Sequence, residues 1–384
     1  MVLEELAELA RPYTWYIIGV GSAAALAVIA WRMRWLGSVV RFAYPNATYN
    51  TMGNRFVTQH DLETLVASNS LPEVLSLVHI KEVNLKDIKD YSTFETTYNR
   101  FHRKRMEGFI QTVPKDIRSV VEAYLAKYEL EIIKTYFKAY HRGKLDEVKD
   151  VVKPWGKIDS HILYNIIDAK DLEEAADALY YTPYGKAVKQ AVDEFDGDLE
   201  YFDSVLDLFY LRNLKESAER THWNIKLSAR EFVDVILDVY YLKLLTRLRS
   251  RPEMPKNFQK LLEQIVPTRT LHGPFLQALW DSEDVPTMVA LLQNTPYGEV
   301  LNTGMKQYQD KGDLSGFEIE LDRFLLNQSV KFGVKNTLTA GPLIRYMVSK
   351  EFEVRNIKVV ARGIYEQIQT ARINSMLVWE AGQS

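Results

Sequence analysis

The tetrapeptide Thr-Pro-Tyr-Gly occurs twice in this chain, in LYYTPYGKAV (179–188) and in LLQNTPYGEV (291–300), 113 positions apart. The residues that lead into it, DLEEAADALYYTPYG (171–185) and DVPTMVALLQNTPYG (284–298), align without a gap. A catalytic motif is seldom duplicated, whereas a structural unit often is. The duplication therefore constrains the fold strongly, because the chain must contain copies of one folded unit.

The repeated unit extends beyond the tetrapeptide and has a weaker third copy. DLEYFDSVLDLFYL (198–211) matches DLSGFEIELDRFLL (313–326), and YSTFETTYNRF (91–101) is similar to both. Each copy ends in a long helical segment with acidic residues, at 123–144, 228–250 and 344–365. The period of roughly 100 residues is far longer than that of solenoid repeats, so each copy is closer to a small domain.

These patterns predict an N-terminal extension followed by three helical repeats. Proline-containing joints at 153–156, Pro252 and Pro255 separate the copies. The predicted parts are an extension, 1–38, with a hydrophobic helix at 12–31, and repeats at 39–153, 154–255 and 256–384.

The secondary structure is predicted to be helical almost throughout. In the second long segment Phe232, Ile236 and Tyr240 recur at helical spacing and form one apolar stripe. Ser228 with Glu231 fits a capping box. In both tetrapeptides the threonine suits an N-cap and the proline the first helical position. No run of alternating apolar residues predicts a sheet, so the predicted fold class is all-α.

The N-terminus is compositionally different from the rest. Residues 12–31 carry no charge, and as a helix they would span about 30 Å, the hydrocarbon thickness of a bilayer. Acidic residues precede this stretch and arginines follow it: Glu4, Glu5 and Glu8, then Arg32, Arg34 and Arg41. The positive-inside rule then places the rest of the chain in the cytoplasm. The acidic start argues against a cleaved signal peptide. A buried or interfacial helix stays open as the alternative, because glycine and alanine make the stretch only moderately apolar.

The composition excludes several classes of function. Lysine plus arginine number 48 against 51 acidic residues, a net charge of −3, which argues against a nucleic-acid partner. The absence of cysteine excludes a disulfide framework, a zinc–thiolate site and a cysteine nucleophile. Neither a phosphate-binding glycine loop nor a paired-histidine motif is present. The sequence thus assigns no catalytic residue, no cofactor, no metal ligand and no small-molecule substrate.

Two clusters of charge have structural explanations. Glu129 with Glu131, and Glu351 with Glu353, are spaced two apart, so on a helix they point about 200° apart and cannot flank one substrate bond. They are expected to pair with nearby cations: Lys134, Arg355, Lys358 and Arg362. The basic run 100–105 is expected to be a solvated helix face, with an anion-binding role as the alternative.

Three segments together resemble the C subunit of the archaeal A-type ATP synthase, which is the equivalent of the d subunit of the V-type ATPases. YMVSKEFEVRNIKVVARG (346–363) is similar to that family's closing helix. YLAKYELEIIKTYFKAYHRGK (124–144) is similar to its first-unit counterpart, and YPNATYNTMGNRFV (44–57) to its usual start. The resemblance covers residues 40–377, whereas the extension departs from a family whose members are usually soluble throughout.

The resemblance implies an all-helical funnel of three homologous domains with pseudo-threefold symmetry. It implies a non-catalytic rotor subunit that links the central stalk to the membrane rotor ring and transmits torque in ATP synthesis or ATP-driven ion transport. The expected location is the cytoplasmic face of the cell membrane, with the N-terminal helix as an anchor. No partner-contact residue is assigned.

Two other hypotheses stay open. A membrane-anchored helical adaptor unrelated to rotary ATPases would also show an anchor, helical repeats and no catalytic residues. An enzyme would require a concave pocket with clustered titratable groups of perturbed pKa.

Overall fold

The fold is all-α, as the sequence predicts. The computed structural model describes residues 2–80, 88–149, 152–194, 197–251 and 258–381. These residues form eighteen helices and, within the same ranges, no strand. An isolated antiparallel bridge joins Trp155 and Ile158. The predicted boundary at residue 255, with the joints Pro252 and Pro255, lies outside the described residues.

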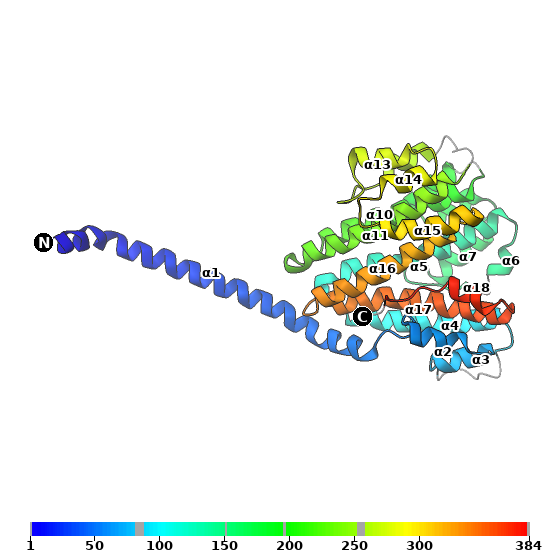
Figure 1. Ribbon diagram of the computed structural model, residues 1–384, viewed down its shortest axis with the longest axis horizontal. Helices are drawn as coiled ribbons and strands as arrows, with labels where there is room; N and C mark the ends of the chain where they lie inside the picture. Colours follow the sequence, from blue (N-terminus) through cyan, green and yellow to red (C-terminus); the bar gives the residue numbers. More distant parts are fainter. Residues whose placement is uncertain (1, 81–87, 150–151, 195–196, 252–257, 382–384) are drawn as a thin grey trace.

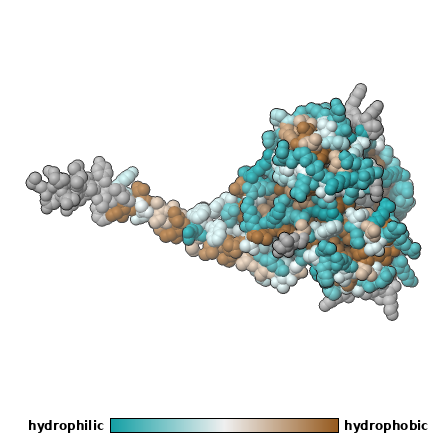
Figure 2. Space-filling model, in the orientation of Figure 1, coloured by the Kyte–Doolittle hydropathy of each residue, from teal (hydrophilic) through white to brown (hydrophobic). Residues whose placement is uncertain are grey.

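Helix α1 (Val2–Met52) projects from the body of the molecule (Figure 1). It contains the predicted helix 12–31 and continues into the body. All side chains of residues 18–33 are exposed, and brown apolar surface follows the helix in Figure 2. By length and composition, Ile18–Met52 could cross a membrane. The membrane span itself stays a prediction.

The remaining helices follow one order three times: short helices, then two long antiparallel helices, then a short closing helix. The first unit contains α2 (Gln59–Val66), α3 (Leu71–Leu77), α4 (Tyr91–Thr112), α5 (Lys115–His141) and α6 (Leu145–Val148). The second contains α7 (Ser160–Asp168), α8 (Leu172–Asp177), α9 (Gly185–Asp193), α10 (Leu199–Glu219), α11 (Trp223–Arg249) and α12 (Gln259–Gln264). The third contains α13 (Gly273–Trp280), α14 (Val285–Leu291), α15 (Gly298–Lys311), α16 (Ser315–Lys335), α17 (Gly341–Tyr365) and α18 (Thr370–Ser375). The division at the predicted boundaries stays a prediction, and α12, grouped here with the second unit, lies after the predicted boundary at residue 255.

The six long helices close into a ring. Within each unit the two long helices pack together: α4 on α5, α10 on α11 and α16 on α17. Between units, α5 packs on α10, α11 on α16, and α17 returns to α4. In Figure 1 these helices run roughly lengthwise, and α1 leaves from one end of them. Units arranged in an open line would lack the contact between α17 and α4.

Two buried apolar clusters hold this arrangement. The larger cluster includes the base of α1 and the end of α4 and continues from α5 through the second and third units to α17. The smaller one fills the contact of α17 with α2, α3 and α4, and includes Phe94, Tyr98, Ile357 and Val360. Both clusters therefore contribute to the closing contact between the last and the first unit, because Phe109 of α4 and Tyr346 of α17 belong to the larger one, with ring centroids 5.3 Å apart.

The duplicated tetrapeptides do not start helices in the predicted way. Helices α9 and α15 begin three residues after the threonines, so the prediction that threonine is the N-cap was wrong. Thr182 Oγ1 instead donates to Leu179 O, and Thr295 Oγ1 to Leu292 O, both at 2.7 Å. The chain folds back at this point, so each hydroxyl hydrogen-bonds to a carbonyl of the preceding turn. The predicted capping box was also wrong, since Ser228 lies inside α11.

The glycine of each tetrapeptide lies against the backbone of the preceding turn. A Cβ atom on Gly185 would be 2.6 Å from Leu179 O, and one on Gly298 would be 2.5 Å from Gln293 O. Real Cβ atoms do not come so close, so only glycine fits either position without a shift of the backbone.

We expect Gly185→Ala and Gly298→Ala each to lower the free energy of unfolding by about 1–3 kcal/mol, the usual range for a forced overpacking. Gly108→Ala is the matched control, because a Cβ there meets nothing within 4 Å. Alanine inside α4 is expected to stabilise the protein by up to about 1 kcal/mol. Urea unfolding monitored by circular dichroism measures all three. Equal effects at the three sites would contradict the close approach.

Candidate functional site

Ion pairs of one pattern join neighbouring units. We call the contacts between neighbouring units seams: α5 with α10, α11 with α16, and α17 with α4. At two of these three seams, two cations spaced four residues apart face two acids with the same spacing. The pairs are Lys134–Asp207 and Lys138–Asp203 between α5 and α10, and Lys243–Asp322 and Arg247–Glu318 between α11 and α16. A spacing of four places both members on one helix face. Equivalent positions in successive repeats therefore form the same ion pairs between units.

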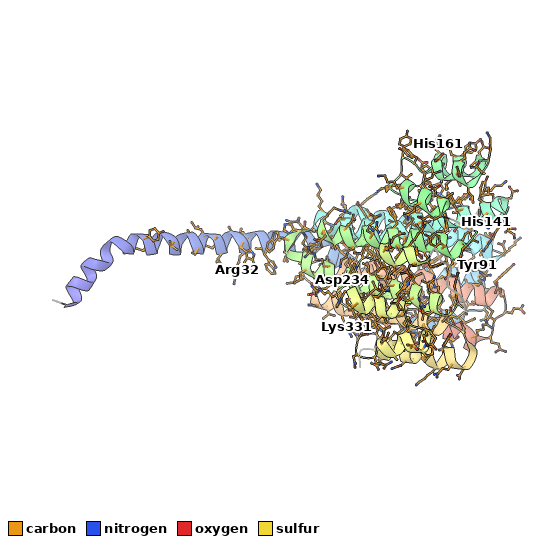
Figure 3. All side chains as sticks on the ribbon, turned by 90° about the horizontal axis from the view of Figure 1, so that it is seen from above. Arg32, Tyr91, His141, His161, Asp234 and Lys331 are labelled. Atoms are coloured by element: carbon orange, nitrogen blue, oxygen red, sulfur yellow. The ribbon has the colours of Figure 1, made fainter. Side chains whose placement is uncertain are left out.

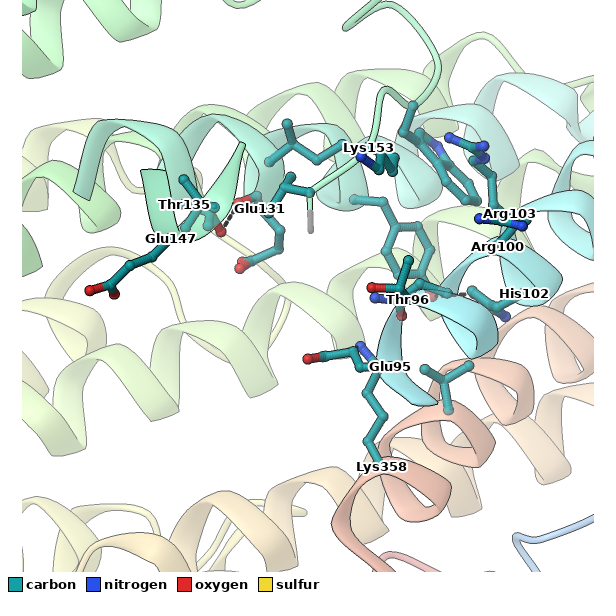
Figure 4. A pocket seen from close by; sticks show the side chains of 17 residues that line it. Glu95, Thr96, Arg100, His102, Arg103, Glu131, Thr135, Glu147, Lys153 and Lys358 are labelled. Atoms are coloured by element: carbon teal, nitrogen blue, oxygen red, sulfur yellow. Dashed lines mark hydrogen bonds and ion pairs between the residues drawn. The ribbon is translucent and has the colours of Figure 1, made fainter. Parts of the chain in front are cut away.

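The third seam, between α17 and α4, keeps one of the two pairs. Lys358 Nζ lies 3.0 Å from Glu95 Oε1. One turn away, the positions that carry charge at the other seams hold Val354 and Asn99. Both line a cavity of about 580 Å³ between α4, α5 and α17 (Figure 4). The cavity thus occupies the place where the other seams have their second ion pair.

An aromatic group forms one wall of this cavity. The His102 ring lies 6.4 Å from that of Trp155, and Tyr128 lies 5.1 Å from Trp155. His102 Nε2 is 3.1 Å from the Tyr128 hydroxyl, while its Nδ1 is buried with no hydrogen-bond partner among the described atoms. Burial, together with the nearby cations, lowers the pKa of His102 to about 3. The imidazole is therefore neutral at pH 7.

Charges of both signs line the rest of the cavity: Arg100, Arg103, Glu131, Glu147 and Lys153, in addition to the Lys358–Glu95 pair. No group of three metal-ligating side chains exists in the part of the chain that the structure describes.

The last long helices of the first and third units meet at Glu351. Its carboxylate accepts hydrogen bonds from the Tyr124 hydroxyl and the Lys127 ammonium, both on α5. Tyr210 of α10 donates to the Tyr124 carbonyl at 3.3 Å. Burial lowers the pKa of Lys127 while Glu351 raises it. Loss of one partner would leave a buried charge unpaired, so this cluster fixes how the units sit against one another.

Two further carboxylates accept from more than one cation. Asp322 of α16 pairs with Lys243 of α11 and with Arg355 of α17. Glu353 of α17, 2% exposed, pairs with Arg105 of α4 at 2.6 Å and with its neighbour Lys350. The expected ion pairing is confirmed for Glu131, which lies 3.7 Å from Lys134, whereas Glu351 and Glu353 pair with cations other than those expected. For Glu129 the expectation was wrong, because its carboxylate accepts from the Tyr184 hydroxyl and the Lys157 backbone N–H.

The basic run 100–105 is only in part the solvated face that was expected. Arg100 and Lys104 are exposed, but His102 is buried in the cavity wall. Arg103 donates to the Pro154 carbonyl, and Arg105 pairs across the third seam. The composition of the run did not indicate which of its residues point inward and which point to solvent.

The tyrosine of each tetrapeptide has a role that the sequence did not predict. The Tyr184 hydroxyl donates to Glu129 Oε2 at 2.8 Å, and the Tyr297 hydroxyl donates to Asp238 Oδ2 at 2.7 Å. Both acceptors are buried and lie on the last long helix of the preceding unit. Burial raises the pKa of Glu129, and raises that of Asp238 to about 6. The repeated tetrapeptide is therefore a joint between units.

The model of the ATP synthase (C/AC39) subunit family matches residues 45–376. The chain belongs to this family. The C subunit of the A-type ATP synthase of Methanocaldococcus jannaschii is 26% identical, with 96% of this chain and 94% of the relative aligned. The protein of the same name from Methanothermobacter thermautotrophicus is 25% identical over 90% of each chain. That of Pyrococcus furiosus is 24% identical over 92% of this chain and 95% of the relative. The resemblance to the C subunit is confirmed.

The alignments also bear on the N-terminal extension. The family model begins after it, at residue 45. The alignment with the Methanocaldococcus protein, however, leaves out only the remaining 4% of this chain, which is shorter than the segment 1–38. Part of the extension therefore aligns with this member of the family.

We expect Tyr297→Phe to lower the free energy of unfolding by about 2–3 kcal/mol at pH 7.5, because the variant removes a hydrogen bond to a buried carboxylate. The folded pKa of Asp238 is raised above its unfolded value, so its charge destabilises the fold as pH rises from about 4 to about 6. At pH 4, with Asp238 protonated, the loss should shrink to about 1 kcal/mol. Urea titrations at both pH values measure this, and an equal loss at both would refute the assignment.

The ionisation of His102 changes the free energy of unfolding with pH in the opposite direction to that of Asp238. Its folded pKa is depressed below its unfolded value, so its contribution to stability falls as pH drops below about 6.5. Between pH 7 and pH 5 the wild type should lose about 2 kcal/mol through this residue. His102→Gln should remove that part of the loss, whereas His60→Gln, at an exposed position, should retain it. The measurement is the pH dependence of urea unfolding for the three proteins.

Proposed function

We propose that this chain is a non-catalytic rotor subunit of an A-type or V-type ATP synthase, located at the cytoplasmic face of the membrane. It would link the central stalk to the membrane rotor ring and pass torque between them. Membership of the C/AC39 family supports this proposal over an adaptor unrelated to rotary ATPases.

The observation that carries the proposal is the closed ring of long helices. Torque applied to an open row of domains would bend the joints between them. A closed ring resists such bending, since each unit is held on two sides, and densely packed interiors transmit strain. The buried pairs at the seams oppose sliding of one unit along the next.

The two ends of the ring are proposed to face different partners. The end from which α1 leaves would face the membrane. The cavity lies away from that end, because its residues come from the second halves of α5 and α17, whose first residues lie beside α1. This far end would receive the central stalk.

We expect Arg105→Leu to uncouple the complex, because Arg105 joins α4 to the buried Glu353 of α17 and helps to close the ring. In ATP synthase purified from membranes, ATP hydrolysis should persist while ATP-driven ion transport per ATP falls. Arg247→Ala is the matched control, since the Arg247–Glu318 pair lies on the surface of another seam and should add little. If the chain does not co-purify with the other subunits of the synthase, the proposed function is wrong.

A further inference from the structure

The base of α1 is fixed to all three units. The contacts lie at the three turns that join the two long helices of each unit. Asn46 Nδ2 donates to the carbonyls of Thr337 (3.1 Å) and Thr339 (2.8 Å), in the turn between α16 and α17. The Trp31 ring lies 6.3 Å from that of Trp223, at the start of α11. The first unit is reached through Asp116, at the start of α5.

Asp116 is the strongest of these attachments. Its carboxylate accepts from the Ser38 hydroxyl at 2.9 Å and from two nitrogens of Arg41, at 3.0 and 2.6 Å. Burial raises the pKa of Asp116, but the donors from α1 outweigh it and hold the pKa below its usual value. The Asp116 carbonyl accepts from His222 N at 3.0 Å, which ties the first turn to the second. Helix α1 therefore cannot swing or turn independently of the body.

Before these contacts in the chain, α1 carries the uncharged stretch 12–31, and the side chains of residues 18–30 are all exposed. These twenty uncharged residues span about 30 Å at the helical rise of 1.5 Å per residue, enough to cross the hydrocarbon core of a bilayer. Leu26 is 66% exposed, Val28 56% and Ile29 57%, so most of each side chain is open to a partner. Figure 3 labels Arg32 on the part of α1 outside the body, close after this apolar stretch. Gly19, Ala23 and Ala27, at intervals of four, would let another helix approach closely.

We propose that α1 is an axial membrane helix of the rotor, and that its apolar surface is covered by the inner wall of the membrane rotor ring. This rests on the proposed function. A helix fixed to a turning body turns with it. If it stood in the lipid outside the ring, it would sweep a circle and strike stationary membrane subunits at every revolution. Only near the rotation axis can such a helix turn in place.

The test is photo-crosslinking in the complete synthase, in membranes, with benzoylphenylalanine incorporated at Leu26. The expected product is an adduct between this chain and the subunit of the rotor ring, with no loss of ATP-driven ion transport, because the two crosslinked parts rotate together. The same probe at Tyr181, 98% exposed on the second unit of the body, is the control and should give no adduct with the ring.

An adduct of Leu26 with a stationary membrane subunit, adducts with lipid alone, or loss of transport on crosslinking to the ring would each overturn the inference. Co-purification of the chain with the other synthase subunits is measured in the same samples. If the chain co-purifies but α1 gives no ring adduct, the axial helix alone is wrong. If the chain does not co-purify, the proposed function itself fails.

Discussion

Everything in this structure depends on how charged side chains are buried where one unit meets the next. A long amphipathic helix can bury an apolar stripe against many neighbours in many registers. A buried carboxylate such as Asp322 or Glu353 is tolerated only where its cations stand opposite it. Sliding one unit by a single helical turn would leave such charges unpaired. The ion pairs therefore define the register of the seams, while apolar burial supplies most of the stability.

The repeats show how this register is encoded. The tetrapeptide keeps its glycine because the backbone folds back on itself there, and its tyrosine because a buried acid of the preceding unit needs a donor. One short motif thus serves both local folding and contact between units. Its two copies perform the same task at successive seams, which explains why a structural motif of this kind is duplicated together with its surroundings.

Sequence reasoning predicted what depends on local pattern and missed what depends on distant partners. Helical spacing, the lack of alternation and the duplicated segments predicted the all-α class and the threefold order. The roles of Tyr184 and Tyr297 were missed because their acceptors lie 55 and 59 residues away in the chain. Thr182 was misassigned because its hydroxyl bonds backward. The cavity could not be foreseen, since it reflects two neutral residues, Asn99 and Val354, that come together only in the folded protein.

The seam between α17 and α4 has a consequence for how the chain folds during synthesis. Its contacts join residues far apart in the chain, such as Arg105 with Glu353, 248 positions later. The apolar face of α4 that packs on α17 therefore lacks this partner until most of the protein has been synthesised. At roughly 5–20 residues per second that delay lasts tens of seconds, with aggregation-prone surface exposed to chaperones throughout. Ring closure carries the entropic cost of closing a long loop, and contacts between residues distant in the chain slow folding.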